Sequence, residues 1–375
     1  MRIAAITNSR IPSLTANSIQ AMKVCDALTE LGHEVKLIAP AEADAADWPS
    51  LAEHYGLQHE FEVAWCPSVR LFRRLDFVWY AHSAARRLRA DLIYTWLPQS
   101  AAWGMRSQYP TILEMHADVA GRFGAWWLRQ FWSGGGRRKM LVTTHALQRA
   151  LERSTGLIFP EQEILIAPNG VDLDRFAGLP EAREARQRLS LPECPTAGFT
   201  GHFYEGRGMQ LLADLARALP EVSFLWVGGT PEAVEEWRER LRSSKISNVH
   251  LAGFIDNNKL PLYQAAADVL LMPYSSSISS SSGQDIAEVI NPMKMFEYMA
   301  AGRAILTANL PSIREVLDET RAVFCPPGDL AAWRAALGEL MANSSRRAEL
   351  ARSARQEVET HTWLARERQA LAGMQ

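Results

Sequence analysis

The segment Gly198-Phe199-Thr200-Gly201-His202-Phe203-Tyr204-Glu205-Gly206-Arg207-Gly208 connects a short apolar run to a stretch with helical periodicity at about 209–219. A strand followed by a glycine-rich loop and a helix is typical of an α/β sheet. Glycines let the backbone approach an anion, and the first turn of a helix offers free N–H groups. Arg207 adds a guanidinium that can hold phosphate oxygens. The Walker A and G-x-G-x-x-G patterns are absent, so the segment predicts either a phosphate-binding loop or a simple tight turn.

Strand-like and helical patterns alternate along the whole chain. The predicted strands are Arg2–Thr7, Glu34–Ala39, Leu92–Thr95, Thr111–Glu114, Leu141–Thr144, Ile164–Ala167, Ala197–Thr200, Ser223–Val227, Val249–Gly253, Val269–Met272, Ala304–Leu306 and Ala322–Phe324. A polar, proline-bracketed stretch at 176–194 separates the two series. We therefore predict an α/β fold with two doubly wound domains, at 1–180 and 195–355, and a C-terminal helix at 356–375. Open α/β sheets bind ligands at the carboxyl ends of their strands, so we expect a cleft between two facing rims.

The composition is that of an ordinary globular protein. The chain has 375 residues, 47% hydrophobic and 22% charged, which fits two domains and excludes wholesale disorder. The net charge of −2 gives no overall attraction to nucleic acid. Four cysteines lie far apart without a C-x-x-C pair, which excludes a zinc ribbon and fits a reducing compartment. The apolar runs are too short for a signal peptide or a membrane-spanning helix, so we expect a cytoplasmic protein.

Basic residues are concentrated in one part of the chain. Residues 1–69 carry 4 basic and 9 acidic side chains, whereas residues 70–153 carry 14 basic and 5 acidic ones together with 6 of the 12 tryptophans. Arginine beside tryptophan is typical of a surface that binds anionic lipid headgroups or an anionic substrate. The alternatives are solvated helix faces over core tryptophans, and a nucleic-acid surface, for which no RNP, KH or helix-turn-helix pattern is present.

A second helix start follows in Val289-Ile290-Asn291-Pro292-Met293-Lys294-Met295-Phe296-Glu297-Tyr298-Met299-Ala300-Ala301-Gly302. Asn291 is predicted as the N-cap and Pro292 as the first helical residue. Lys294 and Glu297 are three residues apart and share one helical face. There the lysine can hold a diphosphate and the glutamate can accept hydrogen bonds from a ribose diol. The alternative is a surface salt bridge between the two side chains.

A histidine follows one of the predicted strands, in Glu114-Met115-His116-Ala117-Asp118. A single histidine at a strand end is either a catalytic group or a structural one. The segment Ala167-Pro168-Asn169-Gly170-Val171-Asp172 ends another strand and predicts a turn. The H-E-x-x-H and G-x-S-x-G patterns are absent, which argues against a metalloprotease or a serine hydrolase.

Taken in order, several segments make the chain resemble the GT-B glycosyltransferases of the retaining GT4 type over nearly its whole length. These segments are Pro12-Ser13, Ala16-Asn17-Ser18-Ile19, Gly32-His33-Glu34-Val35, Pro168 to Asp172, Thr200-Gly201-His202, Gly206-Arg207-Gly208, Val227-Gly228-Gly229, Pro292 to Gly302, Pro326-Pro327-Gly328-Asp329, Thr362-Trp363 and Arg366. The chain departs from the family pattern at two positions. His202 occupies a slot where the family often has arginine, and Glu288 stands one residue before the first slot of a glutamate pair, here Val289.

The resemblance implies two Rossmann-like domains that face each other across a cleft, with the acceptor in the first, the nucleotide sugar in the second and the last helix crossing back to the first. It implies that Arg207 and Lys294 hold the diphosphate and that His116 contacts the donor sugar near the reacting carbon. The donor-binding residues that it implies are Gly201, His202, Gly208, Phe254, Ile255, Glu288, Asn291, Met293 and Glu297. No metal ion or other cofactor is expected.

We therefore expect a retaining, metal-independent transfer of a sugar from a nucleoside-diphosphate sugar to a hydroxyl acceptor. The expected setting is the synthesis of a bacterial cell-surface polysaccharide or glycolipid at the inner face of the cytoplasmic membrane. The expected partners are the donor, a saccharide or lipid-linked acceptor and anionic membrane, without nucleic acid. Two alternatives stay open: a sugar-nucleotide epimerase of similar build, and a catalytically inactive homologue that binds nucleotide.

Overall fold

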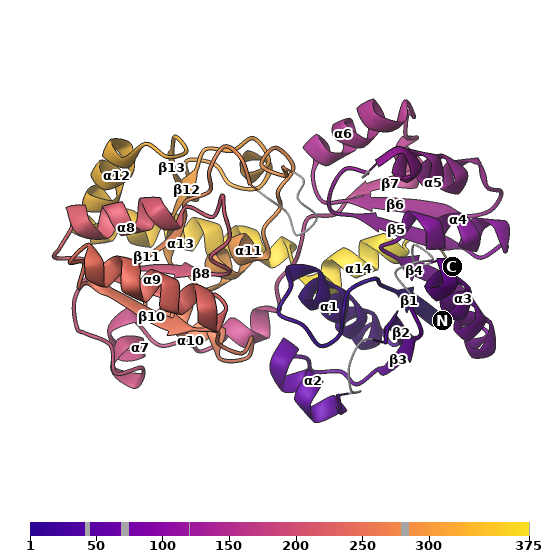
Figure 1. The fold of residues 1–375 in the computed structure, drawn as a ribbon, viewed down its shortest axis with the longest axis horizontal. Coiled ribbons are helices and arrows are strands. Elements are labelled where there is room, and N and C mark those ends of the chain that lie inside the picture. Colours follow the sequence, from indigo (N-terminus) through magenta and orange to yellow (C-terminus); the bar gives the residue numbers. More distant parts are fainter. Residues whose placement is uncertain (42–45, 69–74, 120, 279–284, 375) are drawn as a thin grey trace. The chain divides into compact units, whose positions relative to one another are not determined.

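The computed structural model describes residues 1–41, 46–68, 75–119, 121–278 and 285–374 (Figure 1). The chain folds into two compact units, of which the first comprises Met1–Gly170 with Trp363–Gln375 and the second Val171–Thr362. The boundaries differ from the predicted ones, because residues 171–180 and 356–362 both belong to the second unit. Backbone pairing explains the difference, since the Val171 N–H donates to the His361 carbonyl at 3.0 Å where the chain enters and leaves this unit.

The first unit is built on a parallel sheet with the strand order β3-β2-β1-β4-β5-β6-β7. Its strands are β1 (Arg2–Ile6), β2 (Glu34–Pro40), β3 (Glu62–Cys66), β4 (Leu92–Thr95), β5 (Thr111–Met115), β6 (Arg138–Val142) and β7 (Ile164–Ile166). Consecutive residues from Ile3 to Ile6 have no exposed surface. Both faces of the central strand are therefore covered, as parallel sheets require.

Helices pack on the sheet of the first unit, and they include the last helix of the chain. They are α1 (Ala16–Glu30), α2 (Trp48–Tyr55), α3 (Leu75–Leu88), α4 (Pro98–Arg106), α5 (Gly121–Ser133), α6 (His145–Thr155) and α14 (Trp363–Leu371). Helix α14 packs against α1, so residues more than 300 positions apart in the sequence share one core. Within the described ranges, no helix is long and apolar enough to cross a bilayer.

The second unit repeats the plan with the strand order β10-β9-β8-β11-β12-β13, again all parallel. Its strands are β8 (Thr196–Thr200), β9 (Ser223–Val227), β10 (Val249–Gly253), β11 (Val269–Met272), β12 (Ala304–Ala308) and β13 (Val323–Cys325). Its helices are α7 (Ala182–Arg188), α8 (Met209–Ala218), α9 (Pro231–Ser243), α10 (Leu260–Ala265), α11 (Met293–Ala300), α12 (Leu330–Ala342) and α13 (Ser344–Glu357).

The core of the second unit lies on both faces of its sheet. Along β9, Phe224 and Trp226 join a large cluster of buried apolar residues that includes side chains of α8 and α12. Leu225 and Val227 point the other way, into a smaller cluster with residues of α7 and α10. Alternate strand residues thus belong to opposite faces, as the pleat of a strand dictates.

The predicted α/β fold with two doubly wound sheets is confirmed, and several predicted strands are right to the residue. Most of the other predicted strands are off by one or two residues at an end, and two elements differ more. Strand β6 begins at Arg138, three residues before the predicted start, because a charged pair (Arg138 and Lys139) opens it. Strand β3 was absent from the prediction; it lies at the edge of the sheet, and most of its side chains are only partly buried, so its apolar pattern is weak.

Candidate functional site

In the second unit, a candidate site lies where the strand order reverses. The sheet runs from β8 to β9 and β10 on one side and from β11 to β12 and β13 on the other. Neighbouring strands β8 and β11 are parallel, and their carboxyl ends lead into Gly201 and Pro273. Open α/β sheets bind ligands at such a point, since the loops diverge there and leave room at the sheet edge.

Two glycines let the loop after β8 pass close to neighbouring chain segments. A Cβ at Gly201, which has φ +132°, would lie 2.7 Å from Lys294 Nζ. A Cβ at Gly208, which has φ +78° and forms the N-cap of α8, would lie 1.8 Å from the Pro273 carbonyl oxygen. The glycine loop is therefore packed directly against the end of β11 and the amine of α11.

Gly208→Ala is expected to destabilise the second unit by about 3 kcal/mol or more, because the new methyl group must displace backbone as well as adopt a left-handed conformation. Gly302 provides a matched control. It has φ +63°, but a Cβ there would meet no atom within 4 Å. Gly302→Ala should therefore cost only about 1 kcal/mol of conformational strain. Urea unfolding of both variants measures the difference, and equal losses would contradict the close packing at Gly208.

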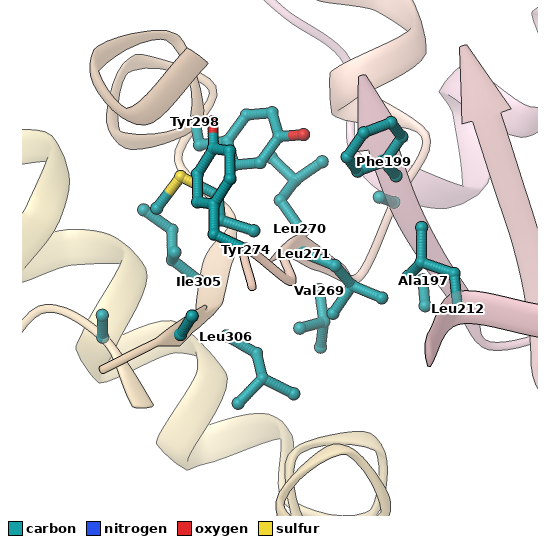
Figure 2. Packing of buried hydrophobic residues seen from close by; sticks show 14 of the residues in the cluster. Ala197, Phe199, Leu212, Val269, Leu270, Leu271, Tyr274, Tyr298, Ile305 and Leu306 are labelled. Atoms are coloured by element: carbon teal, nitrogen blue, oxygen red, sulfur yellow. The ribbon is translucent and has the colours of Figure 1, made fainter. Parts of the chain in front are cut away.

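Two cations flank the ring of Tyr274 at this point. Lys294 Nζ lies 4.0 Å from the centroid of the Phe199 ring and 5.6 Å from that of the Tyr274 ring. The guanidinium carbon of Arg207 lies 5.3 Å from the Tyr274 centroid. Figure 2 shows Phe199 on its strand, and Tyr274 beside Tyr298 at the end of the same buried cluster. These distances fall within the range of cation–π contacts, so the rings hold both cations in place.

Within the described part of the chain, the charges of this cation pair (Arg207 and Lys294) are only partly balanced. Burial and the Arg207 charge lower the pKa of Lys294 well below its ordinary value of 10.5, and the Glu297 carboxylate only partly opposes them. Among the described residues, neither cation forms a salt bridge. A bound anion would relieve the repulsion and favour the protonated amine. An anion with more than one charge, such as a diphosphate, suits two cations best.

Glu297 lies one helical turn from Lys294 and is held from one side. Its Oε2 accepts a hydrogen bond from Gln264 Nε2 at 3.0 Å. Its Oε1 accepts none from a described residue, so this oxygen is the one available to a ligand hydroxyl. The next residue, Tyr298, accepts a hydrogen bond from the Thr200 N–H at 2.8 Å. That bond ties α11 to the end of β8 and fixes the position of Glu297.

The start of α11 differs from the prediction. Pro292 has φ −78° and ψ 130°, so it is the N-cap, and Met293 is the first helical residue. Asn291 is therefore not the cap, although it is buried beside it. Met293 is half-buried. Glu288 is exposed and lies outside the helix, so its predicted role in donor binding stays a prediction.

The remaining donor residues lie on the loops that follow β8 and β10. The His202 ring stacks on the Tyr204 ring, with 4.7 Å between centroids and 10° between planes. Phe254 and Ile255 follow β10, where the Gly253 carbonyl accepts a hydrogen bond from the Gly228 N–H at 2.7 Å. The Phe254 side chain is 41% exposed. The predicted role of Phe254 and Ile255 in donor binding stays a prediction.

In the first unit, a cavity of about 290 Å³ lies at the carboxyl ends of β1, β4 and β5. Amide, imidazole, carboxylate and indole groups line it, among them Asn8, Asn17, Gln99, His116, Asp118 and Trp127. Such groups bind sugar hydroxyls through hydrogen bonds and sugar rings through apolar contact. The half-buried His116 thus lies where a polyhydroxylated ligand can reach it.

Beside His116, the carboxylate of Glu114 is buried in β5 and receives hydrogen bonds from several side chains. Glu114 Oε1 accepts from Gln20 Nε2 at 2.6 Å and from His116 Nε2 at 2.7 Å. Its Oε2 accepts from the Tyr94 hydroxyl at 2.5 Å. Arg366, on α14, forms a close ion pair with the same carboxylate. We call these five residues the Glu114 network. They come from α1, β4, β5 and its following loop, and α14.

A second carboxylate, Glu367, shares the Arg366 guanidinium. Burial acts to raise the pKa of Glu114, but the Arg366 charge and the hydrogen bonds from His116 and Tyr94 outweigh it and lower that pKa to about 2. Burial raises the pKa of Glu367 to about 7, although Arg366 acts in the opposite direction. The two pKa values differ because one guanidinium can neutralise only one carboxylate. Glu114 also receives hydrogen bonds from other side chains.

Glu367→Gln is expected to change how stability depends on pH. The folded pKa of Glu367 lies above its ordinary value of 4.5, so the folded state holds a proton that the unfolded state loses, and stability falls as pH rises from about 4.5 to 7. The variant lacks this loss, so its stability relative to the wild type should rise by about 2–3 kcal/mol between pH 5 and pH 8. Urea unfolding at both values measures the change. Glu30→Gln, on the exposed end of α1, serves as control, and an identical shift there would contradict the prediction.

The sequence did not predict some residues of these two sites. Tyr274 and Gln264 carry no motif, although a polar residue just after an apolar strand is a weak signal for Tyr274. Glu114 had a clearer signal, because a carboxylate interrupts the apolar strand Thr-Ile-Leu-Glu-Met. Buried carboxylates need partners, yet nothing in the local sequence names Arg366 as that partner.

Comparison with known proteins gives a consistent picture. The family models Glycosyltransferase Family 4 and Glycosyl transferases group 1 match residues 18–175 and 194–343, one in each unit. The D-inositol 3-phosphate glycosyltransferase of Xylanimonas cellulosilytica is 32% identical over 212 residues, which are 53% of this chain and 48% of the relative. The GDP-mannose-dependent alpha-(1-6)-phosphatidylinositol monomannoside mannosyltransferase of Mycolicibacterium smegmatis is 26% identical over 213 residues, 55% of this chain and 54% of the relative. The chain thus spans about half the length of these relatives.

A solved structure covers the whole fold. The crystal structure of Anabaena HepE in complex with UDP has a TM-score of 0.75 to this chain at 16% identity, and the match covers 99% of both chains. The two doubly wound sheets thus follow the GT-B plan from end to end. Because the two family models together match most of the chain, one on each sheet-bearing unit, the chain belongs to the GT4-type glycosyltransferases of the GT-B fold.

Proposed function

We propose that this protein transfers a sugar from a nucleoside-diphosphate sugar to a hydroxyl acceptor, with retention of anomeric configuration and without a metal ion. The observation that carries the proposal is the cation pair, which flanks the Tyr274 ring where the second sheet reverses its strand order. Two fixed cations can stabilise a departing diphosphate, which in other enzymes is the work of a divalent metal ion.

The proposed reaction is a same-face substitution at the anomeric carbon. The bond from this carbon to the diphosphate oxygen breaks, the acceptor oxygen forms the new bond, and the hydroxyl proton passes to the leaving phosphate. Negative charge grows on the diphosphate as its bond breaks. Arg207 and Lys294 therefore interact more strongly with the transition state than with the bound donor, which is the condition for catalysis. No carboxylate nucleophile takes part.

The other residues of the site serve donor recognition in this proposal. Glu297 accepts hydrogen bonds from the ribose hydroxyls through Oε1, while Gln264 holds its other oxygen. The nucleobase lies against the backbone around Phe254 and Ile255. The UDP bound to HepE supports a uridine donor, whereas the mycobacterial relative is GDP-mannose-dependent. A comparison of both nucleotides is therefore the first experiment.

Thermal stability with UDP-, GDP-, ADP- and dTDP-sugars tests donor binding. A ligand at 100 times its Kd stabilises the folded state by about 2.7 kcal/mol. The stabilising donor is then incubated with polyol and glycolipid acceptors, with and without EDTA, and NMR of the product gives the anomeric configuration. An inverted product or inhibition by EDTA contradicts the mechanism. Conversion of the donor without acceptor would identify an epimerase, and a donor that binds without any turnover would identify an inactive homologue.

We further propose a lipid-linked acceptor and a peripheral contact with anionic membrane at the inner face of the cytoplasmic membrane. Neighbouring helices α3, α4 and α5 expose large aromatic side chains, namely Trp79, Tyr80, Trp103, Phe123 and Trp126. The same helices expose arginines, namely Arg86, Arg87, Arg106 and Arg129. Aromatic rings beside cations bind the interface of an anionic bilayer. A relative that acts on a phosphatidylinositol mannoside supports this setting.

Replacing Trp79 and Trp126 with serine is expected to weaken binding to anionic vesicles about tenfold, through the apolar surface that the two rings would bury in the interface. Vesicle co-sedimentation with phosphatidylglycerol measures the change. Leu330→Ser, at an exposed apolar residue of the second unit, should leave binding as it is. If the wild type binds neutral and anionic vesicles equally weakly, the membrane proposal fails while the glycosyl-transfer proposal still stands.

A further inference from the structure

The Glu114 carboxylate has no capacity left for a substrate. A carboxylate offers about four acceptor positions on its two oxygens. Gln20, Tyr94, His116 and Arg366 each donate to it. Glu114 borders the cavity, but only 1% of its surface is exposed and its acceptor positions are filled, so it offers no free oxygen to a ligand. Any effect of Glu114 on a reaction in the cavity must therefore pass through one of these four neighbours.

Two of these neighbours, Gln20 and His116, line the cavity, and His116 is the one with an imidazole ring. An ionised carboxylate only accepts hydrogen bonds, so the 2.7 Å contact requires His116 Nε2 to carry the proton. In the neutral ring, Nδ1 is then the acceptor. Among the described residues, Nδ1 has no hydrogen-bond partner, so it remains available to a hydroxyl group of a ligand.

We infer that Glu114 is a positioning residue, which orients His116 and fixes it as the Nε2–H tautomer so that Nδ1 accepts a hydrogen bond from a sugar hydroxyl. A carboxylate that holds a working imidazole in one tautomer is a common device in enzymes. This inference rests on the proposed function for the identity of the ligand. The tautomer itself does not depend on it.

Helix α14 completes the arrangement through Arg366. Without a cation, a carboxylate buried in a β-strand would become protonated and would lose its preference for one His116 tautomer. Arg366 is oriented for this task, because its Nε donates to the Pro168 carbonyl at 3.0 Å. Helix α14 thus places a positive charge beside Glu114 in the first unit, in addition to packing against α1.

The first test is spectroscopic and needs no substrate. Nitrogen-15 NMR of imidazole-labelled wild-type protein near pH 8 should show His116 with a protonated Nε2 and an unprotonated Nδ1. A predominant Nδ1–H form, or a mixture of the two, overturns the inference whatever the enzyme transfers. Because this measurement uses the wild type, it stands even if variants of Glu114 fail to fold.

The second test is a double-mutant cycle with the transferase assay. Glu114→Gln should lower kcat/KM by about 10- to 100-fold in the wild type, but by less than about twofold in the His116→Ala background, since coupled residues are not additive. Equal losses in both backgrounds would mean that Glu114 supports the fold only, and would overturn the inference.

Tyr94→Phe is the control for the spectroscopic test. It removes a different donor to Glu114 and is expected to leave the His116 tautomer unchanged. A changed tautomer in this control would overturn the assignment to the His116 contact. Absence of turnover in the wild type counts against the proposed function and leaves the NMR result valid.

Discussion

Replacing Arg207 with alanine is expected to lower kcat/KM by about 10³-fold, because each charged group aimed at the departing diphosphate contributes a large part of the transition-state stabilisation. The donor affinity should fall as well, since in the proposed mechanism the same guanidinium also contacts the ground-state diphosphate. Lys294→Ala should have a comparable effect. The amine is half-buried and lies 4.0 Å from the Phe199 ring centroid.

A matched variant separates this effect from a general change of charge. Arg217 lies on α8, a helix that follows the glycine loop, and its guanidinium is exposed and paired with Asp214 at 3.4 Å. Arg217→Ala removes the same charge from the same unit without touching the site, so its activity should equal that of the wild type. Arg207→Lys keeps the charge but loses the planar fork, and an intermediate loss is expected. Turnover by Arg207→Ala within threefold of the wild type would show that the cation pair does not carry the reaction.

Arg366→Met is expected to lower the free energy of unfolding by about 3–5 kcal/mol, since it leaves the Glu114 carboxylate buried without its cation. The aliphatic side chain fills a similar volume, so the loss reports the charge more than a cavity. In the variant, Glu114 should take up a proton more readily, because burial raises its pKa and the opposing Arg366 charge is gone. The deficit should therefore shrink as the pH falls through the acid range. Urea unfolding at several pH values measures both effects.

Two further variants test the origin of this loss. The double variant Arg366→Met with Glu114→Gln removes the stranded charge and should recover part of the stability, as expected for directly coupled residues. Arg2→Met breaks the exposed pair with Asp91, in which the side chains are 38% and 42% exposed, and should leave stability unchanged. If Arg366→Met and Arg2→Met lower the free energy of unfolding equally, the buried pair of Glu114 and Arg366 does not stabilise the first unit.

The strands and glycine loops of this protein follow from short-range patterns. Strands such as Leu92–Thr95, Ser223–Val227 and Val269–Met272 are predicted to the residue, because strands buried on both faces leave continuous apolar runs in the sequence. The glycine loop at 201–208 is also visible locally, since few other residues tolerate positive φ there. The missed edge strand β3 illustrates the limit, because a half-exposed strand has no such run.

The sequence by itself determined the α/β class, the two-sheet plan and the candidate cations Arg207 and Lys294, since each follows from the local patterns of strands, loops and helix starts. Only the tertiary structure decided which charged side chains form an ion pair and which aromatic ring the two cations contact. It brings both cations to Tyr274, and it pairs Glu114 with Arg366, 252 residues further along the chain. The physical reason is that burial makes an unpaired charge costly, while the partner that relieves the cost is chosen by the packing of helices and strands, which local sequence does not encode.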